Sequence, residues 1–321
     1  MKAKESANRQ ALAFAAKYGT VICLFGMIVV FSILLPAFRS GTNAVNLLGQ
    51  IAILSVMAAG LTCALKMGDI DMSIGAIASL SGIVAAKVMV AGGGMALGIG
   101  CGLLAGVLMG ALNGFLVAYV GLPNLVCTLA TSFVISGFCM AVTKGLGIYD
   151  LPPVFEFFGR GDVLGIPFRF IFMICLLFVL WFLHNYLPTG RRMDAIGGNP
   201  VSAQLSGIKV EWNRSLGLML SGLCGAVAGI LLTSSTMNAN TFQGPPYLLD
   251  ALGAAFIGAA TIRIGQFHIL GTLVGVLIVV VAVNGLVILM VPSYLTDMIK
   301  GLILLVAIML SGGVGKFLQG R

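Results

Sequence analysis

Long apolar segments separated by short polar breaks constrain the fold of this sequence more than any other feature. A helix needs about 20 mainly apolar residues to cross the hydrocarbon core of a bilayer, and about ten segments approach that length. Their apolar runs are unbroken, whereas the strands of a membrane β-barrel alternate between apolar and polar positions. The segments are Tyr18–Leu35, Leu47–Leu65, Met72–Val90, Met95–Val120, Leu122–Val142, Phe168–Leu187, Ser215–Ser234, Leu248–Ala260, Ile269–Val291 and Leu295–Ser311. We therefore predict an all-α integral membrane protein in which residues 1–321 form a single transmembrane domain.

The basic residues indicate how the helices are oriented, because Lys and Arg near the ends of spans favour the cytoplasmic side. With about ten spans and the N-terminus inside, the cytoplasmic side holds Lys2, Lys4, Arg9, Lys17, Lys66, Arg191, Arg192, Lys209, Arg214, Arg263, Lys316 and Arg321. The outside holds only Arg39, Lys87, Lys144, Arg160 and Arg169. This bias predicts that both termini are cytoplasmic. It also accounts for the net charge of +8 without a nucleic-acid partner.

The sequence shows no residues with the spacing of a catalytic or cofactor site. The P-loop pattern G-x-x-x-x-G-K-[ST] is absent, so the chain is not expected to bind ATP by that route. The two histidines, His184 and His268, have no second ligand at metal-binding spacing. The seven cysteines lie in apolar stretches, where a thiol behaves as a small hydrophobic group. We predict no catalytic residue, no metal site and no cofactor.

Polar residues in apolar surroundings mark the region in which a solute could cross. Ionisable groups at membrane depth are costly and usually face a cavity, a partner or the interface. Asp71 could instead cap the helix that follows it, since a carboxylate is favourable at a helix N-terminus. Neutral polar side chains would suit an uncharged hydroxylated solute, but they could equally tie helices together. The candidate pathway residues are Asp71, Ser73, Asn113, Asn124 and Thr128.

Glycine recurs at every fourth position of the fourth apolar segment. Small residues with this spacing form a smooth stripe on one helix face, along which a second helix can approach closely. We interpret the stripe as a packing surface, with a pore-lining role as the alternative. Its members are Gly98, Gly102, Gly106, Gly110 and Gly114.

The longest predicted cytoplasmic segment covers residues 188–214. At its centre, Asn199 precedes Pro200 and the sequence Val-Ser-Ala-Gln-Leu. Asn favours the N-cap and Pro the first helical position, so we predict a short helix that Gly207 ends. A capped helix among basic residues is suited to docking a soluble partner. The alternative is an ordinary charged loop that only obeys the topology rule.

Three stretches of the chain resemble the permease subunits of bacterial ABC sugar importers of the ribose/xylose/arabinose type. The resemblance covers nearly the whole chain, and the order and spacing of the stretches make it specific. At the position of Asp69 the family usually has glycine. The stretches are Gly68–Gly75 (GDIDMSIG), Ala195–Pro200 (AIGGNP) continuing to Leu205–Ile208 (LSGI), and Leu249–Gly258 (LDALGAAFIG).

The resemblance implies a transport subunit rather than an enzyme, located in the bacterial cytoplasmic (inner) membrane among its lipids. It implies that two permease subunits pair as a homodimer or heterodimer and bind cytoplasmic ATP-binding subunits. A periplasmic or surface sugar-binding protein would deliver a monosaccharide or related polyol from outside. It further implies that segment 188–214 couples the permease to the ATPase. The coupling residues would be Gly197, Gly198, Asn199, Pro200, Leu205, Ser206, Gly207 and Ile208.

Other functions remain open on the sequence. A secondary transporter driven by an ion gradient would need coupling ions at the midplane, for which Asp71 and Asp250 are the candidates. Asp297 and Lys300 are three residues apart and are predicted to neutralise each other on one helix face. Permeases for nucleosides or branched-chain amino acids share the general architecture. An intramembrane enzyme is disfavoured because no nucleophile has a paired base.

Overall fold

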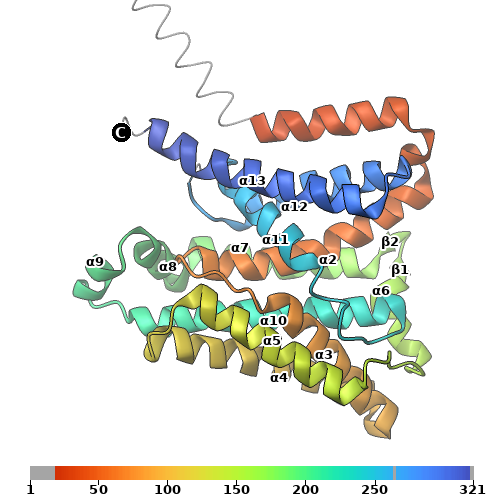
Figure 1. Ribbon diagram of the computed structural model, residues 1–321, viewed down its shortest axis with the longest axis horizontal. Helices are drawn as coiled ribbons and strands as arrows, with labels where there is room; N and C mark the ends of the chain where they lie inside the picture. The colour runs from red at the N-terminus through yellow and green to blue at the C-terminus, as the bar shows by residue number, and fades with distance from the viewer. Residues whose placement is uncertain (1–18, 263–264, 319–321) are drawn as a thin grey trace, which may run out of the picture. The chain divides into compact units, whose positions relative to one another are not determined.

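The computed structural model of the protein describes residues 19–262 and 265–318. This part of the chain is almost wholly helical, with one two-stranded hairpin (Figure 1). It forms two compact units. One unit comprises residues 52–248, and the other combines the described residues of 1–51 and 249–321. We describe each unit by itself.

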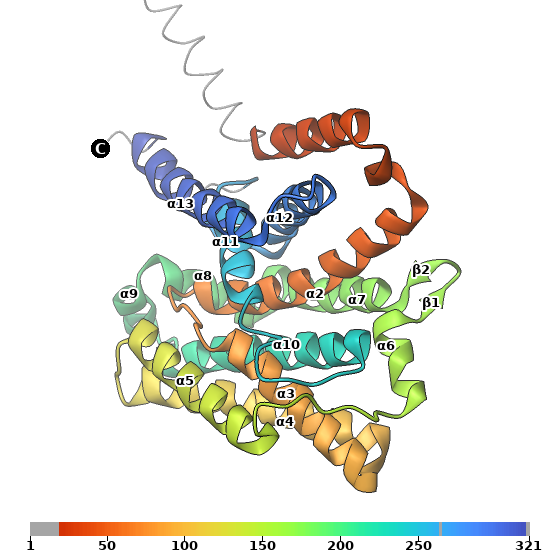
Figure 2. The same cartoon turned by 45° about the vertical axis from the view of Figure 1, so that its right-hand side comes forward.

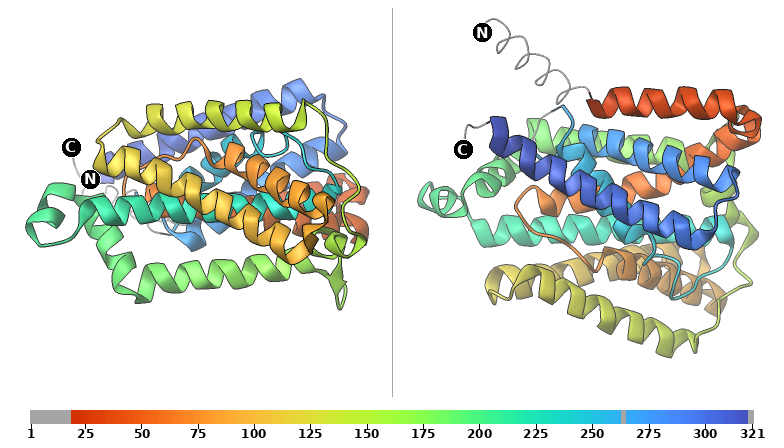
Figure 3. Two further views of the ribbon diagram at one scale, coloured as in Figure 1. Left: turned by 90° about the horizontal axis from the view of Figure 1, so that it is seen from below. Right: turned by 45° about the horizontal axis from the view of Figure 1, so that its top comes forward.

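The unit of residues 52–248 is built around three helices, α3, α4 and α10, which pack on one another (Figure 3). They meet through small residues, which allow the backbones to approach closely. The helix α5 packs on α3, and α7 leads into the short helices α8 and α9. The elements are α2 (Gly41–Leu65, shared with the other unit), α3 (Ile74–Val88), α4 (Gly94–Gly114), α5 (Asn124–Thr143), α6 (Glu156–Arg160), β1 (Asp162–Val163), β2 (Ile166–Pro167), α7 (Phe168–Tyr186), α8 (Pro188–Gly198), α9 (Pro200–Leu205) and α10 (Val210–Thr236).

The other unit contains the helix Gly19–Leu34, the 3-10 turn η1 (Pro36–Arg39), the start of α2, α11 (Tyr247–Ala259), α12 (Ile269–Ile288) and α13 (Ser293–Leu318). Two side-chain amides link α2 to α12: Asn43 Nδ2 donates to Asn284 Oδ1 at 3.1 Å, and Asn284 Nδ2 donates to Asn43 Oδ1 at 2.9 Å. A reciprocal amide pair satisfies polar groups that would be costly to bury alone.

The predicted pairing of Asp297 with Lys300 is wrong. Lys300 Nζ instead lies 2.9 Å from Asp250 Oδ2 and donates a hydrogen bond to it. Asp250 is on α11 and Lys300 on α13, so the ion pair joins two helices of the same unit. Lys300 pairs with Asp250 because both of these side chains are largely buried. An unpaired charge is costly in a buried position. Asp297 is exposed and can remain hydrated.

Each of the ten predicted segments coincides with a helix, and six helical stretches of the described chain are long and apolar enough to span a membrane. The protein is therefore a multi-pass membrane protein. One of the six stretches, Ile74–Tyr119, is not straight. It reverses at the π-turn η2 (Met89–Gly93), where Gly92 and Gly94 have φ values of 87° and 78°. The antiparallel helices α3 and α4 that follow from this reversal pack against each other.

The glycine stripe of α4 is a packing surface, as predicted. Its five members are buried, whereas most of the other α4 residues are half-buried or exposed. A Cβ atom on Gly98 or Gly102 would meet the backbone of α3, and one on Gly110 would meet the backbone of α10 at Leu218. The stripe therefore lets α4 lie between two neighbours at a distance that a side chain would prevent.

Gly110→Val is expected to destabilise the protein by about 1–3 kcal/mol or more, because the added side chain would overpack the α4–α10 contact. Gly100→Val is the matched control, since it places the same side chain on the same helix where no atom lies within 4 Å of a Cβ. Unfolding midpoints in detergent would compare the two variants. Equal midpoints would contradict a packing role for the stripe.

Candidate functional site

The helix α9 forms for the reasons that the sequence predicted. Its N-cap is Asn199, whose side-chain oxygen accepts a hydrogen bond from the backbone N–H of Ser202 at 3.0 Å. Pro200 occupies the first helical position, and Gly207 leaves the helix with φ of 81°. A positive φ is easy for glycine and strained for other residues, so the predicted end of the helix is confirmed.

The preceding helix α8 was not predicted. It begins at Pro188, and the residues on its inner side are Gly190, Met193 and Ile196, at helical spacing. Together with Pro188 at the first helical position, this period was the available signal. The short length and the three glycines concealed it. Residues 188–205 are thus two consecutive helices, hereafter the loop helices.

One face of the loop helices is buried and the other is free among the described residues. Met193 and Ile196 of α8 and Ala203 of α9 pack with Met67 and Val210. On the opposite side Leu205 is 87% exposed. Val201, one helical turn before it, is exposed as well, and neighbouring apolar side chains exposed on one helix are suited to a protein partner.

The loop helices are attached to the end of α2 by two contacts. Gly197 lies against the carbonyl oxygen of Lys66 so closely that a Cβ would overlap it. The Lys66 ammonium lies 3.0 Å from Asp194 Oδ1. The Lys66 side chain is largely buried, whereas that of Asp194 is mostly exposed. A movement of α8 would therefore act directly on the residues that follow Lys66.

Residues 66–73 (hereafter segment 66–73) are joined to α10 by an ion pair. Arg214 donates from Nε to Asp69 Oδ2 at 2.9 Å and from Nη2 to Asp69 Oδ1 at 2.6 Å. The side chain of Asp69 is only 2% exposed. A two-point arrangement of this kind fixes both position and orientation. The sequence showed Asp69 as an extra charge, but its partner is 145 positions away.

Asp71, in the same segment, is buried and accepts three hydrogen bonds. The backbone N–H and the hydroxyl of Ser73 donate to Oδ1 at 2.9 and 2.6 Å, and the Ser221 hydroxyl donates to Oδ2 at 2.7 Å. Asn113 Nδ2 in turn donates to the Ser73 hydroxyl at 2.8 Å. The N-cap of α3 is Ser73 and has no side-chain cap, so Asp71 holds the residue before the helix rather than capping its first turn.

Two residues of α5 hold the backbone of segment 66–73. Asn124 Oδ1 accepts the Ile70 N–H at 2.8 Å, and Thr128 Oγ1 accepts the Met72 N–H at 3.2 Å. The structure thus brings all five candidate pathway residues into one buried cluster. Within the described chain, two buried polar atoms of this cluster have no hydrogen-bond partner: Asn113 Oδ1 and Asn124 Nδ2. The cluster therefore has one acceptor and one donor to offer.

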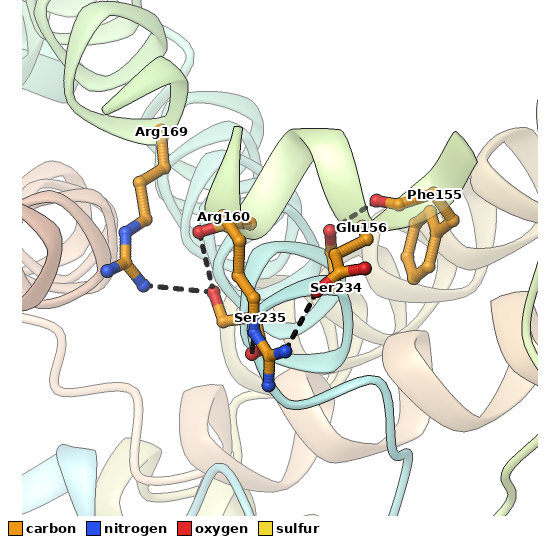
Figure 4. Close-up of polar contacts among 7 residues, drawn as sticks. Phe155, Glu156, Arg160, Arg169, Ser234 and Ser235 are labelled. Carbon is orange, nitrogen blue, oxygen red and sulfur yellow. Dashed lines mark hydrogen bonds and ion pairs between the residues drawn. The ribbon is translucent and has the colours of Figure 1, made fainter. Parts of the chain in front are cut away.

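At the C-terminal end of α10, two arginines bind Ser235. Arg160 Nε donates to the Ser235 carbonyl at 2.7 Å, and Arg169 Nη1 donates to the Ser235 hydroxyl at 3.0 Å (Figure 4). Arg160 also pairs with Glu156 at 2.8 Å. Ser235 lies in the last turn of α10, where cations are favourable. The sequence assigned Arg160 and Arg169 to the outside only by topology.

The loop helices and the hairpin lie at opposite ends of α7 (Figures 1 and 2). With 19 residues, α7 is about 28 Å long, close to the thickness of a hydrocarbon core. Over residues 19–262 and 265–318, no three His, Cys, Asp or Glu side chains are grouped as metal ligands. What the geometry offers is an exposed apolar side of the loop helices, joined to a buried polar cluster by short contacts.

Comparisons with known proteins extend over nearly the whole chain. Residues 43–308 match the family described as branched-chain amino acid transport system / permease component. The ribose import permease protein RbsC of Bacillus subtilis (strain 168) is 40% identical over 296 residues, which cover 92% of each chain. The D-allose transport system permease protein AlsC of Escherichia coli (strain K12) is 32% identical over 318 residues, 97% of each chain. The L-arabinose transport system permease protein AraH of the same strain is 29% identical over 298 residues, 91% of each. No solved structure matches the chain.

Proposed function

The chain belongs to the branched-chain amino acid transport system / permease component family, and from this premise we propose that it is the permease subunit of an ATP-driven importer for a monosaccharide such as a ribose-like sugar or a related polyol. The observation that carries the proposal is the similarity, over at least nine-tenths of both chains, to permeases named for ribose, D-allose and L-arabinose. A subunit of this kind transports and is not an enzyme. ATP is hydrolysed on a separate partner.

The proposed assembly has three kinds of component. Two permease subunits pair in the bacterial inner membrane, each with about ten spans and both termini in the cytoplasm. The two units of each chain act together as one permease domain. Cytoplasmic ATP-binding subunits supply the energy, and an extracytoplasmic binding protein delivers the sugar. The opposite placement of the loop helices and the hairpin on α7 supports one face for each partner (Figure 2).

The ATP-binding subunit docks on the loop helices in this proposal. This proposal is supported by the exposed side of α9, which ends at Leu205. The opposite side of the helix is buried and fixes it in place. The residues proposed to couple the two subunits are Gly197, Gly198, Asn199, Pro200, Leu205, Ser206, Gly207 and Ile208.

Movement of the docked ATPase is passed on through segment 66–73. The Gly197–Lys66 contact and the Lys66–Asp194 ion pair transfer displacement of α8 to the end of α2. From there the hydrogen bonds of Asp69 and Asp71 connect the segment to α10. The loop helices and the polar cluster are therefore mechanically linked within one unit.

The sugar is proposed to pass beside the cluster of Asp71, Ser73, Asn113, Asn124 and Thr128. The free acceptor of Asn113 and the free donor of Asn124 support this, because a hydroxyl group can satisfy both kinds of atom. In the described conformation the other side-chain polar atoms of the cluster already have partners, within the cluster, in the backbone of segment 66–73 or in Ser221. A role of Asn124 in the sugar pathway and a purely structural role predict different effects when this residue is substituted.

Asn124→Asp keeps the oxygen that accepts the Ile70 N–H but removes the free donor. On the pathway proposal, the KM for sugar uptake rises roughly three- to tenfold, the effect of one lost hydrogen bond, at a normal level of folded protein. Asn124→Leu removes both groups and should also reduce the yield of folded protein. Uptake kinetics and size-exclusion profiles would compare the variants. An unchanged KM for Asn124→Asp would assign Asn124 to structure alone.

Reconstitution tests the function directly. Proteoliposomes that contain the permease, the ATP-binding subunit and the binding protein should accumulate radiolabelled ribose only when ATP is supplied. Excess allose should compete, whereas leucine or adenosine should not. Uptake by the permease alone, driven by an ion gradient, would instead establish a secondary transporter. Competition by leucine or adenosine would reassign the solute and leave the permease assignment intact.

A further inference from the structure

A polar cavity of about 600 Å³ opens between α8 and the start of α10. Arg192 of α8 forms one part of its lining, and Lys209 and Trp212 at the start of α10 form another. The turn Ser206–Ile208 closes the remainder. The cavity adjoins the proposed coupling residues, since Ser206, Gly207 and Ile208 belong to both, whereas the exposed apolar end of α9 at Leu205 lies outside its lining.

The lining carries two positive charges and no acid. Arg192 and Lys209 are exposed, and neither forms an ion pair with any residue of the described chain. Other basic side chains of this unit are engaged: Lys66 pairs with Asp194, and Arg214 with Asp69. Two unpaired cations that face one cavity favour an anionic occupant. A guanidinium beside an ammonium is suited to phosphate.

The elements around the cavity favour a membrane lipid over a soluble anion. The first turn of the span α10 lines it, and α8, which lines it too, follows directly on the span α7. Trp181, Tyr186 and Trp212 lie towards this end of their helices, as the aromatic residues of a membrane–water interface do. Trp212 is 52% exposed, and its ring also lines the cavity. Basic pockets between spans at this level bind lipid headgroups.

We propose that this cavity binds the phosphate headgroup of an anionic phospholipid from the adjoining leaflet. Arg192 and Lys209 contact the phosphate, Trp212 lies against the glycerol region, and the acyl chains remain in the bilayer. The site depends on the membrane location of the protein and not on the identity of the transported solute. A bound lipid would brace the start of α10 against α8.

Trp212 can report on the occupant, because the chain has only two tryptophans. In a Trp181→Phe background, the full-length protein is placed in nanodiscs of phosphatidylcholine with increasing fractions of phosphatidylglycerol. We expect a saturable change in Trp212 emission. Arg192→Gln should raise the half-saturating fraction roughly tenfold, the effect of one lost charge-assisted contact. Arg191→Gln is the matched control, since Arg191 is exposed, adjacent and outside the lining.

Three results would overturn the proposal. If Arg191→Gln and Arg192→Gln weaken the response equally, the lipid senses only the general surface charge. If inorganic phosphate or glycerol 3-phosphate reproduces the response in neutral nanodiscs, the site binds soluble anions. If Trp212 emission responds to the ATP-binding subunit but not to phosphatidylglycerol, the cavity receives a protein side chain. Because no sugar is present, the first two results leave the proposed transport function untouched, and the third concerns only where the ATP-binding subunit docks.

Discussion

Gly197→Val is expected to reduce sugar uptake by the reconstituted importer roughly tenfold or more, because it overpacks the contact between α8 and the end of α2. The added side chain would overlap the Lys66 carbonyl. The backbone must then separate at the point where α8 meets segment 66–73. Movement of the ATPase would no longer reach Asp69 and Asp71, and ATP hydrolysis should continue without transport.

Gly100→Val is the control for this prediction. It adds the same side chain on α4, outside the proposed coupling residues, where no atom lies within 4 Å of a Cβ. Uptake and ATP hydrolysis are measured for both variants, together with co-purification of the ATP-binding subunit. If the Gly197 variant retains its subunit and transports as well as the Gly100 variant, the proposed link between α8 and segment 66–73 is refuted.

Asp69→Asn should cost about 3 kcal/mol of stability, the lower end of the range for breaking a buried ion pair. The lower end applies because the side chain of Arg214 remains 29% exposed, so water screens part of its charge. The loss arises because Arg214 would keep its charge without a carboxylate. Unfolding by denaturant in detergent measures the effect.

Two further variants make this second prediction specific. Asp69→Leu combined with Arg214→Met should recover most of the lost stability, since removing both charges leaves no unpaired ion. Glu156→Gln breaks the exposed pair with Arg160 and should cost less than about 1 kcal/mol. If Asp69→Asn is no more destabilising than Glu156→Gln, the Asp69–Arg214 pair does not hold segment 66–73 in place.

The local features of the fold followed from the sequence. The apolar segments coincide with helices because backbone groups in lipid must bond within their own segment. The helix α9 followed from Asn199, Pro200 and Gly207, whose effects act within a few residues. The glycine period of α4 is local as well, because a helix places every fourth residue on one side. The period therefore indicated a packing face.

Only the tertiary structure decided which distant groups meet. Lys300 was assigned to its neighbour Asp297, but it pairs with Asp250, 50 positions away. Arg214 is 145 positions from Asp69, and Ser221 is 150 from Asp71. No local pattern encodes such pairs, because they depend on how the helices cross. The sequence by itself determined the long apolar helices, the cap of α9 and which polar residues lie in apolar surroundings. Packing decided their partners, since a buried charge or amide takes whichever complementary group the neighbouring helix brings within hydrogen-bonding distance.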